Sequence, residues 1–142
     1  AGASDYVIKT TSEDFLSLGS RGWSAVVDDL VGFAVTYADA TGHDLAEHRQ
    51  FMAILEREPK LLARFIGIGK EREAGLVELV ALREGVSPTD ARARASVDVV
   101  STIMRSTADR LSDPRVAENF GAALLHSLTA LREVLAPGEA HA

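Results

Sequence analysis

The residues best suited to chemistry interrupt the apolar side of one long amphipathic stretch, Pro59–Gly85. At 3.6 residues per turn, that side carries Leu61, Leu62, Phe65, Ile66, Ile68, Gly69, Leu76, Val77, Leu79 and Val80. Arg72 and Glu73 fall within it, whereas Gly67 points outward. Buried charged groups are costly unless they are paired. Two interpretations stay open: a structural pair that reaches neighbouring helices or the surface, or the polar end of an internal cavity.

The four histidines offer little catalytic or metal-binding geometry. His126 lies on the polar side of its predicted helix and His141 near the end of the chain, while His43 and His48 are five residues apart and share no face. Asp44 and His48 have i, i+4 spacing, which gives at most a weak metal pair. The absence of cysteine excludes disulfides, thiolate zinc sites and cysteine nucleophiles. No ExxH pair, nucleophile elbow, phosphate loop or HExxH motif occurs, so we expect no enzyme, metal or cofactor.

One histidine has a second possible role. His48 sits within the apolar stripe of its predicted helix, which comprises Leu45, Phe51, Met52 and Leu55. It is either a core histidine whose ring bonds to a backbone carbonyl or to Tyr37, or a polar contact in a ligand cavity. The core histidine is the default interpretation, and the ligand contact stays open as the alternative, because the same apolar residues are typical of a plain core.

Composition indicates one soluble domain. The chain has 142 residues, 46% of them hydrophobic and 25% charged, which is enough for a real core. A net charge of −6 argues against nucleic-acid binding by this stretch itself, since phosphate affinity comes from clustered Lys and Arg. No apolar run is long enough to span a bilayer, and the first residues do not resemble a signal peptide. We therefore expect a cytoplasmic protein with no membrane partner.

Helix start and stop signals predict an all-α antiparallel bundle of five main helices. The first runs from Trp23 to near Ala40, and the second, capped by Asp44 or Thr41, ends before Pro59. After Pro59–Gly85, a helix capped by Ser87 runs to about Leu111, and a last one spans Arg115 to Ala136. Ahead of them lies a short helical piece, Phe15 to Leu18. We expect a lead-in segment over residues 1–20, the domain over 21–137, and a disordered tail over 138–142.

The last two helices are apolar on two sides. Each apolar arc covers roughly 200°, about twice what one core requires. One side suits the domain's own core, and the other suits the same helix pair of a second copy, which would give a two-fold four-helix interface. We therefore predict a homodimer, with interface residues Val99, Ile103, Phe120, Leu124, Leu128 and Leu131.

The order of these parts resembles the C-terminal domain of TetR-family transcriptional regulators. The resemblance rests on a Glu58-Pro59 break, the long helix LLARFIGIGKEREAGLVELV, a Gly-Val-Ser-Pro-Thr-Asp restart and two closing helices of the dimer-forming type. It extends from about Phe15 to Leu135. It is similar in particular to actinobacterial-type members whose effector domains are thought to take acyl-CoA-like or other apolar ligands.

This resemblance implies a ligand-sensing and dimerisation domain of a transcriptional repressor. Ligand binding would shift a connecting helix, of which Phe15–Leu18 would be the end, and change the spacing of two DNA-binding heads. The family's helix-turn-helix unit needs roughly 45 residues, but only about 14 precede the first helical piece, so we expect it to be absent from this chain. The hypothesised pocket is lined by Trp23, Leu30, Tyr37, His48, Phe51, Met52, Phe65, Gly69, Arg72 and Met104.

Two other classes remain open from the sequence. An all-α homodimer that presents a surface to another protein, with no ligand, would show the same helices and the same apolar closing pair. An enzyme of unrecognised type is the third class, although no motif supports it.

Overall fold

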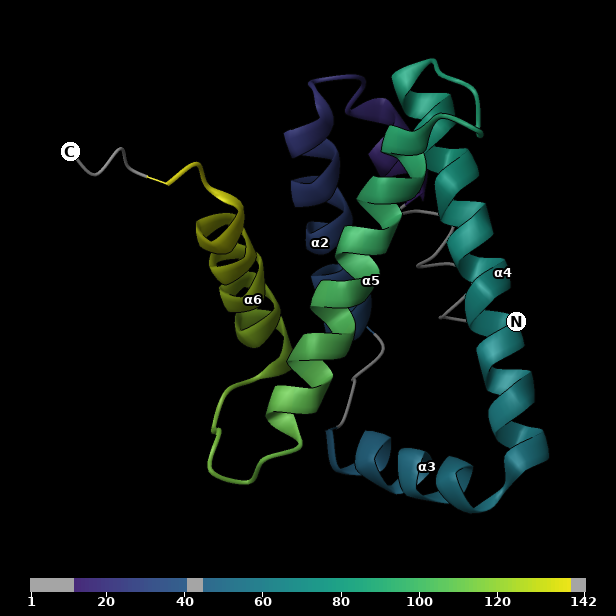
Figure 1. Ribbon diagram of the computed structural model, residues 1–142, viewed down its shortest axis with the longest axis vertical. Helices are drawn as coiled ribbons and strands as arrows, with labels where there is room; N and C mark the ends of the chain where they lie inside the picture. The colour runs from purple at the N-terminus through teal and green to yellow at the C-terminus, as the bar shows by residue number, and fades with distance from the viewer. Residues whose placement is uncertain (1–11, 41–44, 139–142) are drawn as a thin grey trace.

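The computed structural model describes residues 12–40 and 45–138, and all regular structure within those ranges is helical. A short helical segment spans residues 12–17. It is followed by α2 (Trp23–Ala40), α3 (Leu45–Arg57), α4 (Pro59–Glu84), α5 (Ala91–Leu111) and α6 (Phe120–Leu135). Figure 1 shows α2, α5 and α6 side by side, with α4 and α3 forming an angle away from them. The predicted all-α bundle is confirmed. The caps predicted at Thr41 and Asp44, and the His48 side chain, lie outside what the structure describes.

The longest helix begins and ends where the sequence predicts. Pro59 opens α4 after Glu58, whose extended φ of −123° suits the residue before a proline. Gly85 closes the helix with φ of 67°, a left-handed conformation that glycine adopts at little cost. The backbone N–H of Val86 donates back to the Ala81 carbonyl at 3.0 Å. The local backbone preferences of Pro59 and Gly85 therefore fix both ends of α4.

The predicted starts of the two closing helices are wrong. Asp90, not Ser87, caps α5, since its carboxylate accepts the Arg92 backbone N–H at 2.9 Å. The α6 helix begins at Phe120 instead of Arg115, with the Asn119 side chain accepting the Ala122 N–H at 2.7 Å. Each earlier polar side chain serves a turn: the Ser87 hydroxyl bonds Thr89, and Asp113 accepts the N–H of Arg115.

The α5 cap gives a pH-dependent prediction. Hydrogen bonds from the Arg92 guanidinium, and then from its backbone N–H, lower the pKa of Asp90 to about 2. A carboxylate with a depressed folded pKa stabilises the fold above its unfolded pKa, near 3.9, and that contribution is lost as pH falls through the folded value. Asp90→Asn keeps the cap but cannot titrate. We expect wild-type unfolding free energy to fall more steeply than the variant's between about pH 4 and pH 2. Parallel profiles in denaturant titrations would contradict this.

The core lies between α2, α5, α6 and the C-terminal half of α4. Its buried residues are Phe15, Val26, Leu30, Val31, Val77, Val80, Ala81, Ala93, Val97, Val100, Ile103, Leu124 and Leu128. Burying this much apolar surface is the main favourable term for a domain of this size. Phe15 belongs to the short segment over 12–17, so that segment is part of the packed domain. No described helix is long and apolar enough to cross a membrane.

Candidate functional site

The N-terminal half of α4 carries core-type residues that the core does not cover. Val77 and Val80 are buried, but the same face contains Phe65 and Ile66, which are exposed. In Figure 1, α4 leaves the other helices toward its N-terminal end, where it meets α3. The apolar face of α4 therefore changes from core to solvent-accessible surface along one helix.

The middle of α5 shows a matching gap. Met104 lies seven residues from both Val97 and Leu111, which puts all three on one face of the helix. Val97 and Leu111 are buried, whereas Met104 is 38% exposed. A continuous core would cover all three. Figure 1 shows α4 and α5 diverging toward the C-terminal end of α5.

Three contacts join α3, α4 and α5 into a triangular arrangement, which we call the frame (Figure 1). Phe51 of α3 and Phe65 of α4 pack edge to face, with ring centroids 5.5 Å apart. The Glu73 carboxylate of α4 lies 3.2 Å from the Arg94 guanidinium of α5. The Arg49 guanidinium of α3 donates to the Leu111 carbonyl at the end of α5. Both phenylalanines remain 42% exposed, so the frame has uncovered apolar surface although its three helices are held by these contacts.

Cationic groups accompany this apolar surface. Arg72 follows Phe65 by two turns on the same flank of α4 and is exposed. Arg72 has no acidic partner within the described ranges, and the same holds for Arg57, Lys60, Arg64 and Lys70. Glu73 is different, since it pairs with Arg94. Of the two sequence interpretations, the structural pair describes Glu73, and Arg72 is left unpaired beside the apolar residues.

The structure brings some of the predicted pocket residues to the frame and places others elsewhere. Phe51, Phe65, Gly69, Arg72 and Met104 belong to its three helices, as does the half-buried Met52. Among the described residues, no atom lies within 4 Å of a Cβ added at Gly69.

The three predicted residues of α2 have other positions. Leu30 is buried in the core, and Tyr37 is half-buried near the end of the helix. Trp23 lies far from the Phe51–Phe65 corner, at the start of α2, where the Arg92 guanidinium stacks over its ring at 5.0 Å from the ring centre. The structure therefore does not bring Trp23 into the frame.

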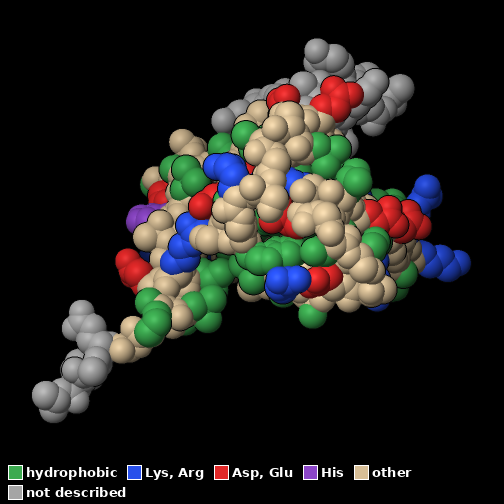
Figure 2. All heavy atoms as spheres, turned by 90° about the horizontal axis from the view of Figure 1, so that it is seen from above, with side chains coloured by type: hydrophobic (Ala, Val, Ile, Leu, Met, Phe, Trp, Pro, Cys, Tyr) green, Lys and Arg blue, Asp and Glu red, His purple; other side chains and the backbone are tan. Residues whose placement is uncertain are grey.

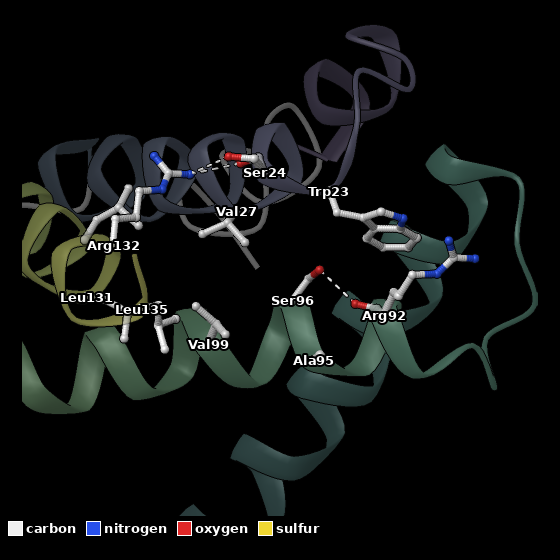
Figure 3. Close-up of a pocket in the computed structure, with 11 residues that line it drawn as sticks. Trp23, Ser24, Val27, Arg92, Ala95, Ser96, Val99, Leu131, Arg132 and Leu135 are labelled. Carbon is white, nitrogen blue, oxygen red and sulfur yellow. Dashed lines mark hydrogen bonds between the residues drawn. The ribbon is translucent and has the colours of Figure 1, made fainter. Parts of the chain in front are cut away.

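A groove that the sequence did not indicate lies between α2, α5 and α6. This groove of about 380 Å³ is lined by Trp23, Ser24, Val27, Arg92, Ala95, Ser96, Val99, Leu128, Leu131, Arg132 and Leu135. Figure 3 shows Trp23 and Arg92 at one end, and Leu131, Leu135 and Arg132 at the other. Arg132 donates to Asp28 at 2.6 Å and to both the carbonyl and the hydroxyl of Ser24 at 3.1 Å, so these three hydrogen bonds all join it to α2.

The predicted dimer residues divide into two groups. Ile103, Leu124 and Leu128 are buried in the core of the single chain, and Leu128 also lines the groove. Val99, Phe120 and Leu131 are half-buried, and Val99 and Leu131 line the groove. The C-terminal end of α6 continues the same stripe with Leu135, which is 68% exposed. Seen from the end where α2 begins, hydrophobic side chains are uncovered in the middle of the molecule and beside the C-terminal tail (Figure 2).

The chain belongs to the C-terminal domains of TetR-family regulators, because residues 24–139 match a family model of that type. The matching model is described as the MftR C-terminal domain. No curated protein and no solved structure gave a match. The resemblance carried by the long helix and the Gly-Val-Ser-Pro-Thr-Asp restart is thus confirmed. Domains of this family generally act in effector binding and dimerisation and are generally not enzymes. In the described ranges, no group of three His, Cys, Asp or Glu side chains is placed to hold a metal ion.

Proposed function

We propose that this domain senses a small apolar or acyl-type effector and thereby controls DNA binding by a helix-turn-helix unit, as part of a cytoplasmic repressor. The observation that carries the proposal is the uncovered apolar surface of the frame: Phe51 and Phe65 are each 42% exposed although their rings are in contact, and Met104 is 38% exposed between two buried residues of its α5 face. Contiguous exposed apolar surface in a soluble protein is typical of a binding site. In this protein, the helices of the frame carry such surface, at Phe51, Phe65 and Met104.

The chemistry of the frame supports an amphipathic ligand. Phe51, Phe65 and Met104 offer apolar walls, which a hydrocarbon chain would cover with a gain of about 25 cal/mol per Å² of apolar surface removed from water. Arg72, which is unpaired within the described ranges and lies two turns from Phe65 on the same flank, suits a carboxylate or another anionic head group. An apolar wall with a few placed polar groups is the usual form of a small-molecule site.

Ligand binding would act by changing the frame. A ligand shifts a conformational equilibrium only by its difference in affinity for the two states. An effector that bridges α3, α4 and α5 would favour the arrangement in which its apolar walls are closest. The resulting movement of α4 relative to α2 and α5 would change the geometry of the dimer and of the attached DNA-binding units.

The dimer is the second part of the proposal. A second copy of the chain would cover the groove and the exposed end of α6, through Val99, Phe120, Leu131 and the neighbouring Leu135. A symmetric pairing of this kind uses the same patch on both subunits. The pairing would remove from water the apolar stripe of α6, including Leu131 and Leu135, that the rest of the single chain leaves uncovered.

Native mass spectrometry of the protein purified from its host tests the proposal. We expect a mass for two chains plus a retained small molecule that is released by organic solvent. A dimer that never carries a small molecule, and that does not take up a dansyl-labelled fatty acid, would instead favour the protein-interaction module. Identifying a helix-turn-helix segment in the same gene would test the regulatory part independently.

A further inference from the structure

One buried arginine joins three separate segments of the chain. Arg83, near the C-terminal end of α4, has a side chain with 0% exposure. Its Nε donates to the Gly19 carbonyl at 2.9 Å, its Nη1 to the Phe15 carbonyl at 3.5 Å, and its Nη2 to the Asp29 carboxylate of α2 at 2.7 Å. The guanidinium carbon also lies 4.3 Å from the centre of the Phe15 ring. Arg83 therefore holds the segment over 12–19 against both α2 and α4.

The surroundings of Arg83 strengthen this attachment. Phe15 is fully buried, and its ring packs edge to face on Phe33 of α2 at 5.6 Å. The Ser20 hydroxyl donates to the Glu84 carboxylate at 3.0 Å, and Arg21 pairs with Asp29 at 2.5 Å. We call Phe15, Gly19, Asp29 and Arg83 the latch. Each of its four residues touches a segment other than its own.

Packing alone does not explain an arginine at this position. A buried ion pair contributes little net stability, because desolvation offsets much of the attraction, and apolar residues of similar volume often serve as well. The hydrogen bonds of Arg83 do something that apolar packing does not: they require two backbone carbonyls and one carboxylate in defined directions. The latch thus specifies how the segment over 12–19 is oriented relative to α4.

The same helix links the latch to the frame. Phe65 and Arg83 are 18 residues apart, five full turns, so they project from the same side of α4 at a separation of about 27 Å. Any rotation of α4 about its axis turns both side chains by the same angle. A tilt about the packed contact at Val77 and Val80 moves them in opposite directions. A movement that begins at the frame therefore reaches Arg83 through a continuous helix.

We propose that the latch transmits changes at the frame to the segment over 12–19, and so to any part of the protein attached ahead of it. The regulatory meaning of this coupling rests on the proposed function, but the coupling itself requires no ligand. Arg83 acts as a positioning residue: its hydrogen bonds require α4 and the segment to move together. Chains of packed side chains and rigid helices with two arrangements are the physical means of such coupling.

Hydrogen exchange of the peptide over 12–19, measured on the whole chain, tests the attachment. We expect Arg83→Met to speed this exchange by about tenfold or more relative to α6, because hydrogen bonds to a charged group are lost. The matched control is Arg110→Met, which removes an arginine that bonds the Ala123 carbonyl at 3.3 Å between α5 and α6. The control should leave the peptide unchanged. Unaltered exchange in Arg83→Met would overturn the proposal.

A double-mutant cycle tests the coupling without a ligand. Phe65→Ala removes the Phe51 contact at the frame, and its effect on exchange over 12–19 is measured with Arg83 present and in Arg83→Met. Substitutions this far apart normally act additively. We expect the Phe65→Ala effect to fall by at least about threefold when Arg83 is absent, and additive effects would refute transmission. Should Arg83→Met not fold, Asp29→Asn, which removes the carboxylate that accepts from Arg83, replaces it in both experiments. Failure of ligand uptake would refute the proposed function alone.

Discussion

Gly69→Trp is expected to abolish uptake of a dansyl-labelled fatty acid, with a loss of affinity of about a hundredfold. Gly69 lies on the same face of α4 as Phe65 and Val80, and a Cβ added there has no neighbour within 4 Å in the part of the chain that the structure describes. An indole at this position would fill the space that a ligand needs between α4 and α5. Affinity would fall by about 2.7 kcal/mol for a hundredfold loss. Fluorescence titration measures the effect.

The matched control is Gly67→Trp. Gly67 belongs to the same helix, also has open space around it, and lies on the opposite face. Both substitutions replace a helical glycine with a residue of better helix propensity, so both should preserve or slightly raise stability. Uptake should survive in Gly67→Trp. Equal uptake by the two variants would show that the frame is not where the probe binds.

The second large effect concerns the dimer. Leu135→Asp is expected to weaken self-association by about a hundredfold, because a carboxylate without a partner would be buried between the two copies. Leu135 ends the apolar stripe of α6 and is 68% exposed in the single chain. Sedimentation velocity over a concentration series gives the dimer dissociation constant directly.

Leu82→Asp provides the comparison. Leu82 is 69% exposed, nearly the same as Leu135, but lies on α4 and outside the groove. The same change of charge at the same exposure should leave the dissociation constant unchanged. A wild-type chain that sediments as a monomer at all concentrations would contradict the dimer proposal itself, whatever the variants do.

Local signals explain which parts of the fold were predictable. Pro59 and Gly85 fix the ends of α4 through their own backbone restrictions, and these depend on no distant contact. The predicted starts of α5 and α6 were wrong because Ser87 and Asp113 are as suitable for helix caps as Asp90 and Asn119, the residues that cap the two helices in the structure. In the structure, the side chains of Ser87 and Asp113 form hydrogen bonds within turns instead. Nothing in the local sequence shows which of two suitable residues will cap the helix.

The candidate site was predictable only in part, for a related reason. Phe65, Gly69 and Arg72 were found together because helical periodicity alone places them on one side of α4. The position of α2 relative to that helix is set by packing between distant segments, so periodicity could not show that Trp23 lies over Arg92 instead. The latch was missed because it depends on Arg83 meeting residues more than 50 positions away.

The dimer surface shows the same limit in another form. Leu124, Leu128, Leu131 and Leu135 follow one stripe of α6, and their spacing does not tell core from interface. The structure separates them by burial: Leu124 is fully buried in the core, whereas Leu135 is 68% exposed. Burial along a helix is decided by where its neighbours end.

Photo-crosslinking with a diazirine-labelled fatty acid, followed by peptide mapping, tests the central claim most directly. Binding at the frame predicts labelled peptides from residues 51–76 of α3 and α4 and from the part of α5 around Met104, with labelling competed by unlabelled dodecanoic acid. Labelling confined to the groove, at Trp23, Val27 or Leu131, would contradict the account. So would a chain that acquires no competed label at all.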